Sequence, residues 1–197
     1  MTNEVDEMSR RLLLGLVMAV LLAGALTPMV LAMAGPLPSE VQEVRAAVAR
    51  YHSVAQAVRD GYSLEGQPCV TSPLGTMGYH AVNRDLLQSG ANDPKKPPIL
   101  LYVPGEDGNL KLAGVEYWAI ALANTPDGPA PYFTPPDSGP PPPDGFATTA
   151  PSLFGQTFNG PMPGHNPSMP WHYDLHVWLF EANPAGLFTP FNTALGC

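Results

Sequence analysis

The sequence predicts an α+β domain in which one long amphipathic helix packs on a small antiparallel sheet, with long Pro/Gly-rich loops between the elements. The helix is indicated by apolar residues at three- and four-residue spacing over residues 39–61. The sheet is indicated by two apolar runs flanking a turn at 99–122 and by an alternating stretch at 171–181. The loops follow from 25 prolines and 19 glycines in 197 residues.

The helix is expected to begin at Ser39, because Ser39 and Gln42 form an S-x-x-Q capping box, and to end at Gly61, which can adopt a left-handed C-terminal cap. His52 lies at the edge of its apolar stripe and is interpreted as a half-exposed helix histidine. The stripe consists of Val41, Val44, Ala47, Val48, Tyr51, Val54, Ala55 and Val58.

The sheet is expected to contain a hairpin followed later by a third strand. The run ILLYV at 99–103 reads as a buried strand, the turn formers at 104–109 end it, and 110–122 returns as the second arm. Because side chains alternate along a strand, Glu116 and Trp118 share one face of this arm. In the third strand, at 171–181, one face carries His172, Asp174, His176 and Trp178.

The segment at 125–150 differs in composition from the rest of the chain. It is mostly Pro, Gly, Asp, Ser and Thr, and its tetraproline at 140–143 favours polyproline II. We expect a flexible surface excursion here, with a protein partner as one interpretation of its role. Residues 151–170 are also expected to be short of regular structure.

The N-terminus has the parts of an export signal. Arg10 and Arg11 precede an apolar stretch at 12–34 that ends in Ala-Met-Ala. The stretch is also long enough to span a bilayer, so an uncleaved membrane anchor at 12–34 is the alternative to cleavage. The paired arginines resemble a twin-arginine signal or serve as an ordinary positive n-region. Whether the segment is cleaved or stays as an anchor, 35–197 is predicted to be a single exported domain, periplasmic or extracellular.

The two cysteines, Cys69 and Cys197, predict a disulfide, since exported chains meet an oxidising compartment. The competing interpretation is that the Cys197 thiolate is a metal ligand. The bridge is favoured because oxidising conditions promote it.

Composition and motifs exclude several functions. A net charge of −8 with only 9 Lys and Arg argues against nucleic acid and against anionic membrane surfaces, so contact with a membrane is expected only through the N-terminal segment. The sequence has no phosphate-binding glycine loop, nucleophile elbow, haem-attachment motif or H-E-x-x-H helix, so most familiar enzyme classes lack support.

A metal site is the most specific functional hypothesis. Glu116 lies in the middle of an apolar strand, where a carboxylate must be paired, hydrogen-bonded or bound to metal. If the strands at 110–122 and 171–181 pair in register, Glu116 and His176 meet, and His80 completes a set suited to iron, copper or zinc. His172 and Asp174 are expected around this set or as alternative ligands. The competing interpretation is a metal-free Glu–His hydrogen bond.

A second ligand set lies in the loop before the last strand. Thioethers and imidazoles together suit copper, especially Cu(I). The competing interpretation takes the methionines as apolar contacts among prolines. The set is Met162, His165, Met169 and His172.

Two metal-free functions remain as alternatives. Trp118 and Trp178 are expected to line a pocket beside the predicted metal set, and that pocket could bind a small apolar or aromatic molecule without metal. The other alternative is an envelope interaction protein that uses the Pro-rich loop at 125–150.

The order of short motifs along the mature chain resembles that of an uncharacterised family of small exported bacterial proteins. The resemblance covers nearly all of 35–197 apart from the Pro-rich stretch, and it implies a single secreted domain while transferring no catalytic residue. The motifs are CV (69–70), MGYHAVN (77–83), LLYVP (100–104), GVEYW (114–118), LFGQ (153–156), YDLHVWLFEANPAG (173–186) and a final Cys.

Overall fold

The computed structural model describes residues 37–66 and 68–197, and the residues from Leu37 onward form one compact unit. The predicted export signal or anchor at 1–34 lies outside the described residues. Within the described ranges, no helix combines the length and apolar character needed to cross a bilayer.

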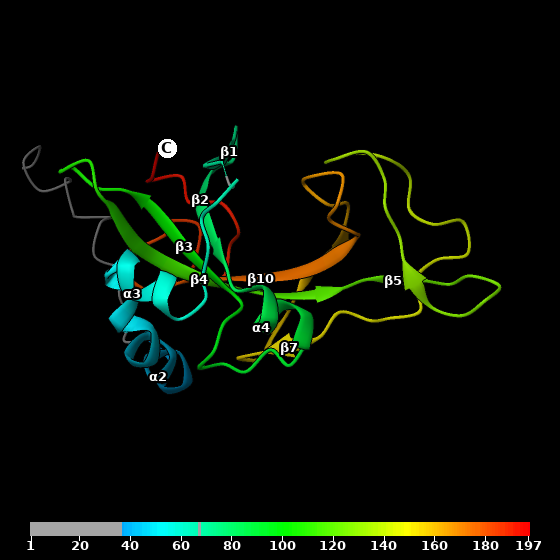
Figure 1. Cartoon of the computed structure of the whole chain (residues 1–197), viewed down its shortest axis with the longest axis horizontal. Helices are drawn as coiled ribbons and strands as arrows, with labels where there is room; N and C mark the ends of the chain where they lie inside the picture. Colours follow the sequence, from blue (N-terminus) through cyan, green and yellow to red (C-terminus); the bar gives the residue numbers. More distant parts are fainter. Residues whose placement is uncertain (1–36, 67) are drawn as a thin grey trace, which may run out of the picture. The chain divides into compact units, whose positions relative to one another are not determined.

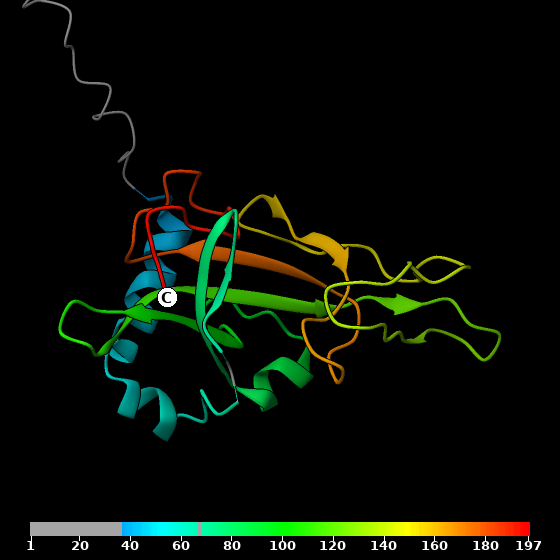
Figure 2. The same ribbon diagram turned by 90° about the horizontal axis from the view of Figure 1, so that it is seen from above.

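The unit is built on a six-stranded antiparallel sheet in the order β1-β2-β3-β4-β10-β9, which curls into an open half-barrel (Figures 1 and 2). β3 and β4 form the hairpin that the sequence predicts, and β10 is the predicted third strand. The strands are β1 (Val70–Ser72), β2 (Gly75–Val82), β3 (Ile99–Pro104), β4 (Leu110–Ile120), β9 (Asn159–Met162) and β10 (His172–Trp178).

The helical residues form short pieces, and the prediction of one long helix on a small sheet is wrong. The described chain is mostly antiparallel sheet. The helices are α2 (Ser39–Val48), the 3-10 helix η1 (Ala49–His52), α3 (Val54–Arg59) and α4 (Arg84–Ser89).

The break in the expected helix lies at Ser53. Its backbone is extended, with φ −86° and ψ 106°, and its side chain accepts a hydrogen bond from the Gln56 N–H. Ser53 therefore ends one helix and caps the next. The predicted apolar stripe is buried only before the break. In α3, Ala57 reaches the core, whereas Ala55 and Val58 of the stripe are exposed.

The two predicted helix caps have different outcomes. The capping box is not formed: Pro38 is the N-cap of α2, and the Gln42 amide donates to the Leu37 carbonyl instead. Gly61 is confirmed as a left-handed cap, with φ +91°. The Tyr62 N–H donates to the Ala57 carbonyl across it, which is the bond that closes a Schellman motif.

One face of the sheet packs against the helices α2, η1 and α3. Alternate residues of the central strands form this apolar core with one side of α2, and the Tyr102 hydroxyl donates to the Tyr51 carbonyl of η1 at 2.6 Å. Members that are fully buried include Val41, Val44, Val48, Leu100, Val115, Tyr117 and Val177.

The other face of the sheet is covered in part by the C-terminal segment. Asn192 bridges to Thr76 of β2, and a small apolar cluster forms around Trp178 with Leu195 packed against it. The predicted disulfide between Cys69 and Cys197 is present, with an S–S distance of 2.01 Å. Cys197 is therefore a bridge partner, and its interpretation as a thiolate metal ligand is wrong.

The Pro-rich segment at 125–150 is irregular, as expected, but it is fastened to the fold. The Trp171 N–H donates to the Tyr132 carbonyl, and the Phe146 ring lies 5.4 Å from the Trp171 ring. Its flexibility stays a prediction. The segment contributes β6 (Ala130–Pro131) to a small hairpin with β5 (Leu122–Ala123), and a second hairpin, β7 (Ser152–Leu153) with β8 (Gln156–Thr157), follows it.

Candidate metal centre

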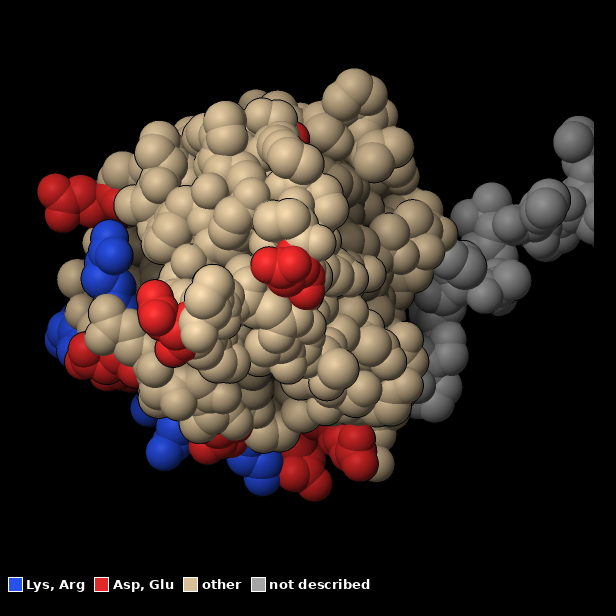
Figure 3. Space-filling model, turned by 90° about the vertical axis from the view of Figure 1, so that its right-hand side faces the viewer, with Lys and Arg blue, Asp and Glu red and all other residues tan. Residues whose placement is uncertain are grey.

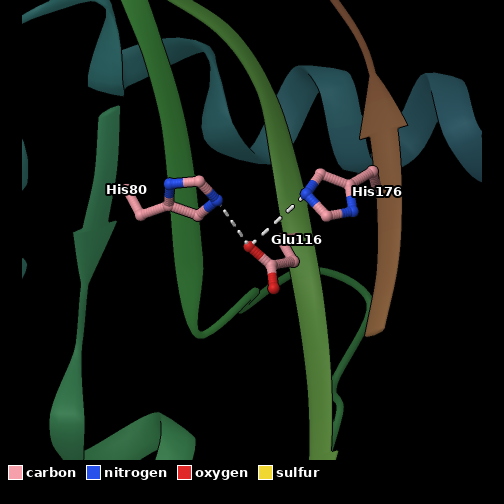
Figure 4. A group of neighbouring side chains, drawn as sticks. All are labelled: His80, Glu116 and His176. Atoms are coloured by element: carbon pink, nitrogen blue, oxygen red, sulfur yellow. Dashed lines mark ion pairs between the residues drawn. The ribbon is translucent and has the colours of Figure 1, made fainter. Parts of the chain in front are cut away.

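Three side chains from three strands meet on the face of the sheet opposite α2 (Figure 4). Glu116 Oε2 lies 3.2 Å from His80 Nε2 and 3.7 Å from His176 Nε2. The ligand atoms that the three residues offer all lie within 4.8 Å of one another. Two histidines and one glutamate are thus close enough to hold a metal ion.

Strand register brings these residues together. β4 and β10 are antiparallel neighbours, and Glu116 lies directly opposite His176. The predicted metal site depends on this pairing. His80 comes from β2, on the far side of β3, where it pairs with Leu101 while Ile99 of β3 pairs with Glu116. Its side chain therefore reaches across β3 to the carboxylate (Figure 4).

The centre is buried and its hydrogen bonding is incomplete. The side chain of His176 is 1% exposed, that of Glu116 5%, and that of His80 14%. Among the described residues, neither ring nitrogen of His176 has a hydrogen-bond partner, nor does Glu116 Oε2. The short contact between His80 and Glu116 is therefore an ion pair outside hydrogen-bond geometry. His80, the least buried of the three, marks the side nearest solvent.

Burial and charge oppose each other at this centre. Burial alone raises the pKa of Glu116, but the neighbouring His176 and His80 outweigh it and hold that pKa below its usual value. Burial alone lowers the pKa of His176, whereas Glu116 and Asp174 more than offset it and raise that pKa. The carboxylate is consequently ionised and available as a metal ligand at neutral pH.

Asp174 and His172 extend the polar row along β10. Asp174 Oδ1 lies 3.8 Å from His176 Nδ1 and accepts a hydrogen bond from the Asn159 amide at 3.3 Å. His172 Nδ1 lies 3.2 Å from the Pro170 carbonyl, and its ring stacks on Trp118 at 5.7 Å. Asp174 is therefore placed next to a predicted ligand, whereas His172 faces a different set of neighbours.

The two tryptophans of the predicted pocket have different surroundings. Trp118 stacks on His172, and its Nε1 has no hydrogen-bond partner within the part of the chain that the structure describes. Trp178 is buried in the cluster under Leu195, and its Nε1 donates to the Thr189 carbonyl at 2.7 Å. A cleft lies elsewhere, lined by Glu40, Glu43, Asp93, Pro94, Lys95, Leu153 and Phe154.

The alternative copper set is partly assembled. The rings of His165 and His172 lie 5.6 Å apart, and Met162 of β9 is the register partner of His172. His165 Nδ1 contacts Asp137 Oδ1 of the Pro-rich segment.

Asn159 and β2 are parts of the site that sequence reasoning missed. Asn159 approaches Asp174 through the β9–β10 pairing, and β9 is too short to show a pattern. His80 was identified as a candidate ligand, but the sequence analysis expected no strand around it, and it lies in the strand β2.

Comparison of the chain with protein-family models, with curated proteins and with solved structures finds no match. The functional argument therefore depends on the geometry of the described residues.

Proposed function

We propose that this protein is a metal-binding domain that holds one transition-metal ion through His80, Glu116 and His176. The observation that carries the proposal is the set of buried donor atoms without hydrogen-bond partners, which belong to Glu116 and His176. Each such atom costs about 1–3 kcal/mol when it is left unpaired. A metal ion bound between them would remove that cost.

The donor set suits iron, copper or zinc. Imidazole nitrogen and carboxylate oxygen bind these ions at about 2.0–2.2 Å, so the spacing of the three residues needs only a small contraction around the ion. Three protein ligands leave positions open for water or a substrate. Asp174 is the proposed outer partner of His176, because a carboxylate on the second ring nitrogen directs the first toward the metal.

The disulfide indicates an oxidising environment, which agrees with the proposal that the domain is exported. The alternatives of a metal-free pocket for a small apolar or aromatic molecule and of a protein partner for the Pro-rich segment stay proposals. The buried carboxylate favours the metal, because an apolar ligand would leave Glu116 Oε2 without a hydrogen bond or a metal bond.

Elemental analysis tests the proposal directly. The protein is exported by its own N-terminal segment, purified without chelator or affinity tag, and measured for iron, copper and zinc by ICP-MS. We expect about one equivalent of one of these metals, following the mononuclear geometry. Glu116→Gln keeps the size of the side chain and removes the charge, so it should lower the metal content with little change in fold.

His52→Asn is the matched control, because His52 is an exposed histidine of η1 that packs on Phe180, away from the proposed ligands. It should keep the full metal content. A wild-type protein that carries no metal as purified and takes up none on titration with Zn²⁺, Cu²⁺ or Fe²⁺ would overturn the proposal.

A further inference from the structure

His172 has the hydrogen-bonding pattern of a metal-binding histidine, although it is not one of the three ligands proposed above. Its ring is fully buried, Nδ1 faces the Pro170 carbonyl at 3.2 Å, and Nε2 has no hydrogen-bond partner among the described residues. A proton on Nδ1 is thereby held by the carbonyl, and the lone pair of Nε2 is left free. Metal-binding histidines show the same division, with one nitrogen on an oxygen acceptor and the other on the metal.

His165 shows the same division at the surface. Its ring lies 5.6 Å from that of His172 at an angle of 76°, its Nδ1 contacts Asp137 Oδ1, and its side chain is 38% exposed. The Asp137 N–H donates to the Gly164 carbonyl, so the carboxylate is fixed to the loop that carries His165. Two imidazoles, each oriented through Nδ1, therefore lie side by side with Nε2 available.

A thioether completes the group. Met162 is paired with His172 across β9 and β10, and paired residues in antiparallel strands project from the same face of the sheet. Met162 is half-buried, so this thioether side chain is neither sealed in the core nor fully in solvent. Met169 lies in the same loop, four residues beyond His165.

The charge of this part of the chain favours a cation. No Lys or Arg follows Lys111 in the sequence. In the view that faces this end of the molecule, Lys and Arg gather toward the margin while acidic side chains are scattered over it (Figure 3). The carboxylates beyond Lys111 are Glu116, Asp127, Asp137, Asp144, Asp174 and Glu181.

We propose a second metal site, independent of the buried centre, in which His165, His172 and Met162 bind a copper ion. Two imidazoles and a thioether form a soft donor set that selects Cu(I) over zinc and over hard cations. Asp137 acts as a positioning residue that orients the His165 ring, and it gives the Pro-rich segment a structural role in the site. The partial exposure of His165 supplies the route of entry for the ion.

The test measures Cu(I) affinity of the chelator-stripped protein under ascorbate, in competition with bicinchoninate. His165→Asn and Met162→Leu should each weaken binding by at least the roughly 10–100-fold that is typical for loss of a supporting group, and Asp137→Asn should fall within that range. His165 and Asp137 are exposed, so these variants leave the core intact. X-ray absorption of the copper-loaded protein should show a sulfur neighbour that is lost in Met162→Leu.

The Glu116→Gln variant separates this site from the buried centre. This variant should keep the wild-type Cu(I) affinity of the site formed by His165, His172 and Met162, whether or not the buried centre binds a metal. Zinc binding should be unaffected by Met162→Leu. The proposal is overturned if His165→Asn and Met162→Leu bind Cu(I) as tightly as the wild type, or if Glu116→Gln alone abolishes Cu(I) binding.

Discussion

The two faces of the central sheet are both buried, but they differ in how far their buried polar atoms are hydrogen-bonded. On the helix-covered face the buried tyrosine hydroxyls are hydrogen-bonded. Those of Tyr102 and Tyr117 donate to the backbone carbonyls of Tyr51 and Pro94, and that of Tyr51 accepts from the Arg50 guanidinium. Of the six buried side-chain polar atoms without partners among the described residues, five lie on the opposite face. They belong to Glu116, Trp118, His172 and His176.

This difference separates a structural face from a functional one. Burial alone does not distinguish them, since Val115 and Tyr117 are 0% exposed and Glu116, between them in β4, is only 3% exposed. Native proteins satisfy nearly all buried polar atoms, so a cluster of exceptions on one face needs an explanation. A bound cation provides one, and the following predictions test whether the two faces differ as proposed.

The largest effect is expected on the helix-covered face. Leu100 of β3 is fully buried in the core beneath the helices. Leu100→Ala should therefore lower the free energy of unfolding by about 2–5 kcal/mol through lost burial and the cavity left behind. Urea denaturation measures the change. Val58→Ala, at a side chain that is 57% exposed, is the control and should shift stability by less than about 0.5 kcal/mol.

Metal should stabilise the opposite face. An ion that binds only the folded state at about 100 times its dissociation constant raises the free energy of unfolding by about 2.7 kcal/mol. Thermal denaturation with and without the metal found by elemental analysis should show this gain in the wild type and in His52→Asn. Glu116→Gln should show little or none. An equal gain in Glu116→Gln would place the ion elsewhere.

High pH should weaken the helix-covered face. Burial raises the pKa of Tyr62, Tyr102 and Tyr117 well above the usual value. In the unfolded chain these phenols ionise near pH 10, whereas in the folded protein they stay protonated, so their contribution to stability is constant below about pH 10 and falls above it. Each tyrosine contributes about 1.4 kcal/mol per pH unit.

Urea denaturation at about pH 9 and about pH 11 measures this slope, and Tyr102→Phe should reduce it by the share of one tyrosine. An unchanged slope in Tyr102→Phe would contradict the prediction.

The smallest loss of stability is expected where the polar centre is replaced by apolar residues. Glu116→Leu combined with His176→Leu removes three of the five unpartnered atoms of this face, and buried ion pairs exchanged for well-packed apolar residues are often neutral or stabilising. The free energy of unfolding of the metal-free protein should therefore stay the same or rise. A loss of unfolding free energy as large as that of Leu100→Ala would show that Glu116 and His176 stabilise the metal-free fold.

The sequence predicted the strands that carry the centre better than the helices that cover it. The strands β4 and β10 are long enough to show alternation, and the isolated carboxylate of Glu116 in an apolar strand requires a partner such as His176. The helix break was missed because the apolar spacing of the sequence continues through Ser53, although Ser53 and Gln56 have the same S-x-x-Q spacing as Ser39 and Gln42.

The strand β2 was missed because glycines mask it. Gly78 has φ +96°, and a Cβ there would collide with the Tyr102 carbonyl of β3, so the residue is required by a close approach that only the folded sheet reveals. The size of the sheet was also underestimated because its short strands β1 and β9 leave no periodic signal.

The bridge between Cys69 and Cys197, 128 residues apart, turns the region between them into a covalent ring that holds all six strands of the sheet. The proposed ligands of both metal sites lie within that ring. A single protease cut in the Pro-rich segment at 125–150 would fall between β4 and β10, yet both fragments would stay attached through the sulfur atoms. The domain can thus be nicked within the Pro-rich segment and still migrate as one species until a reductant is added.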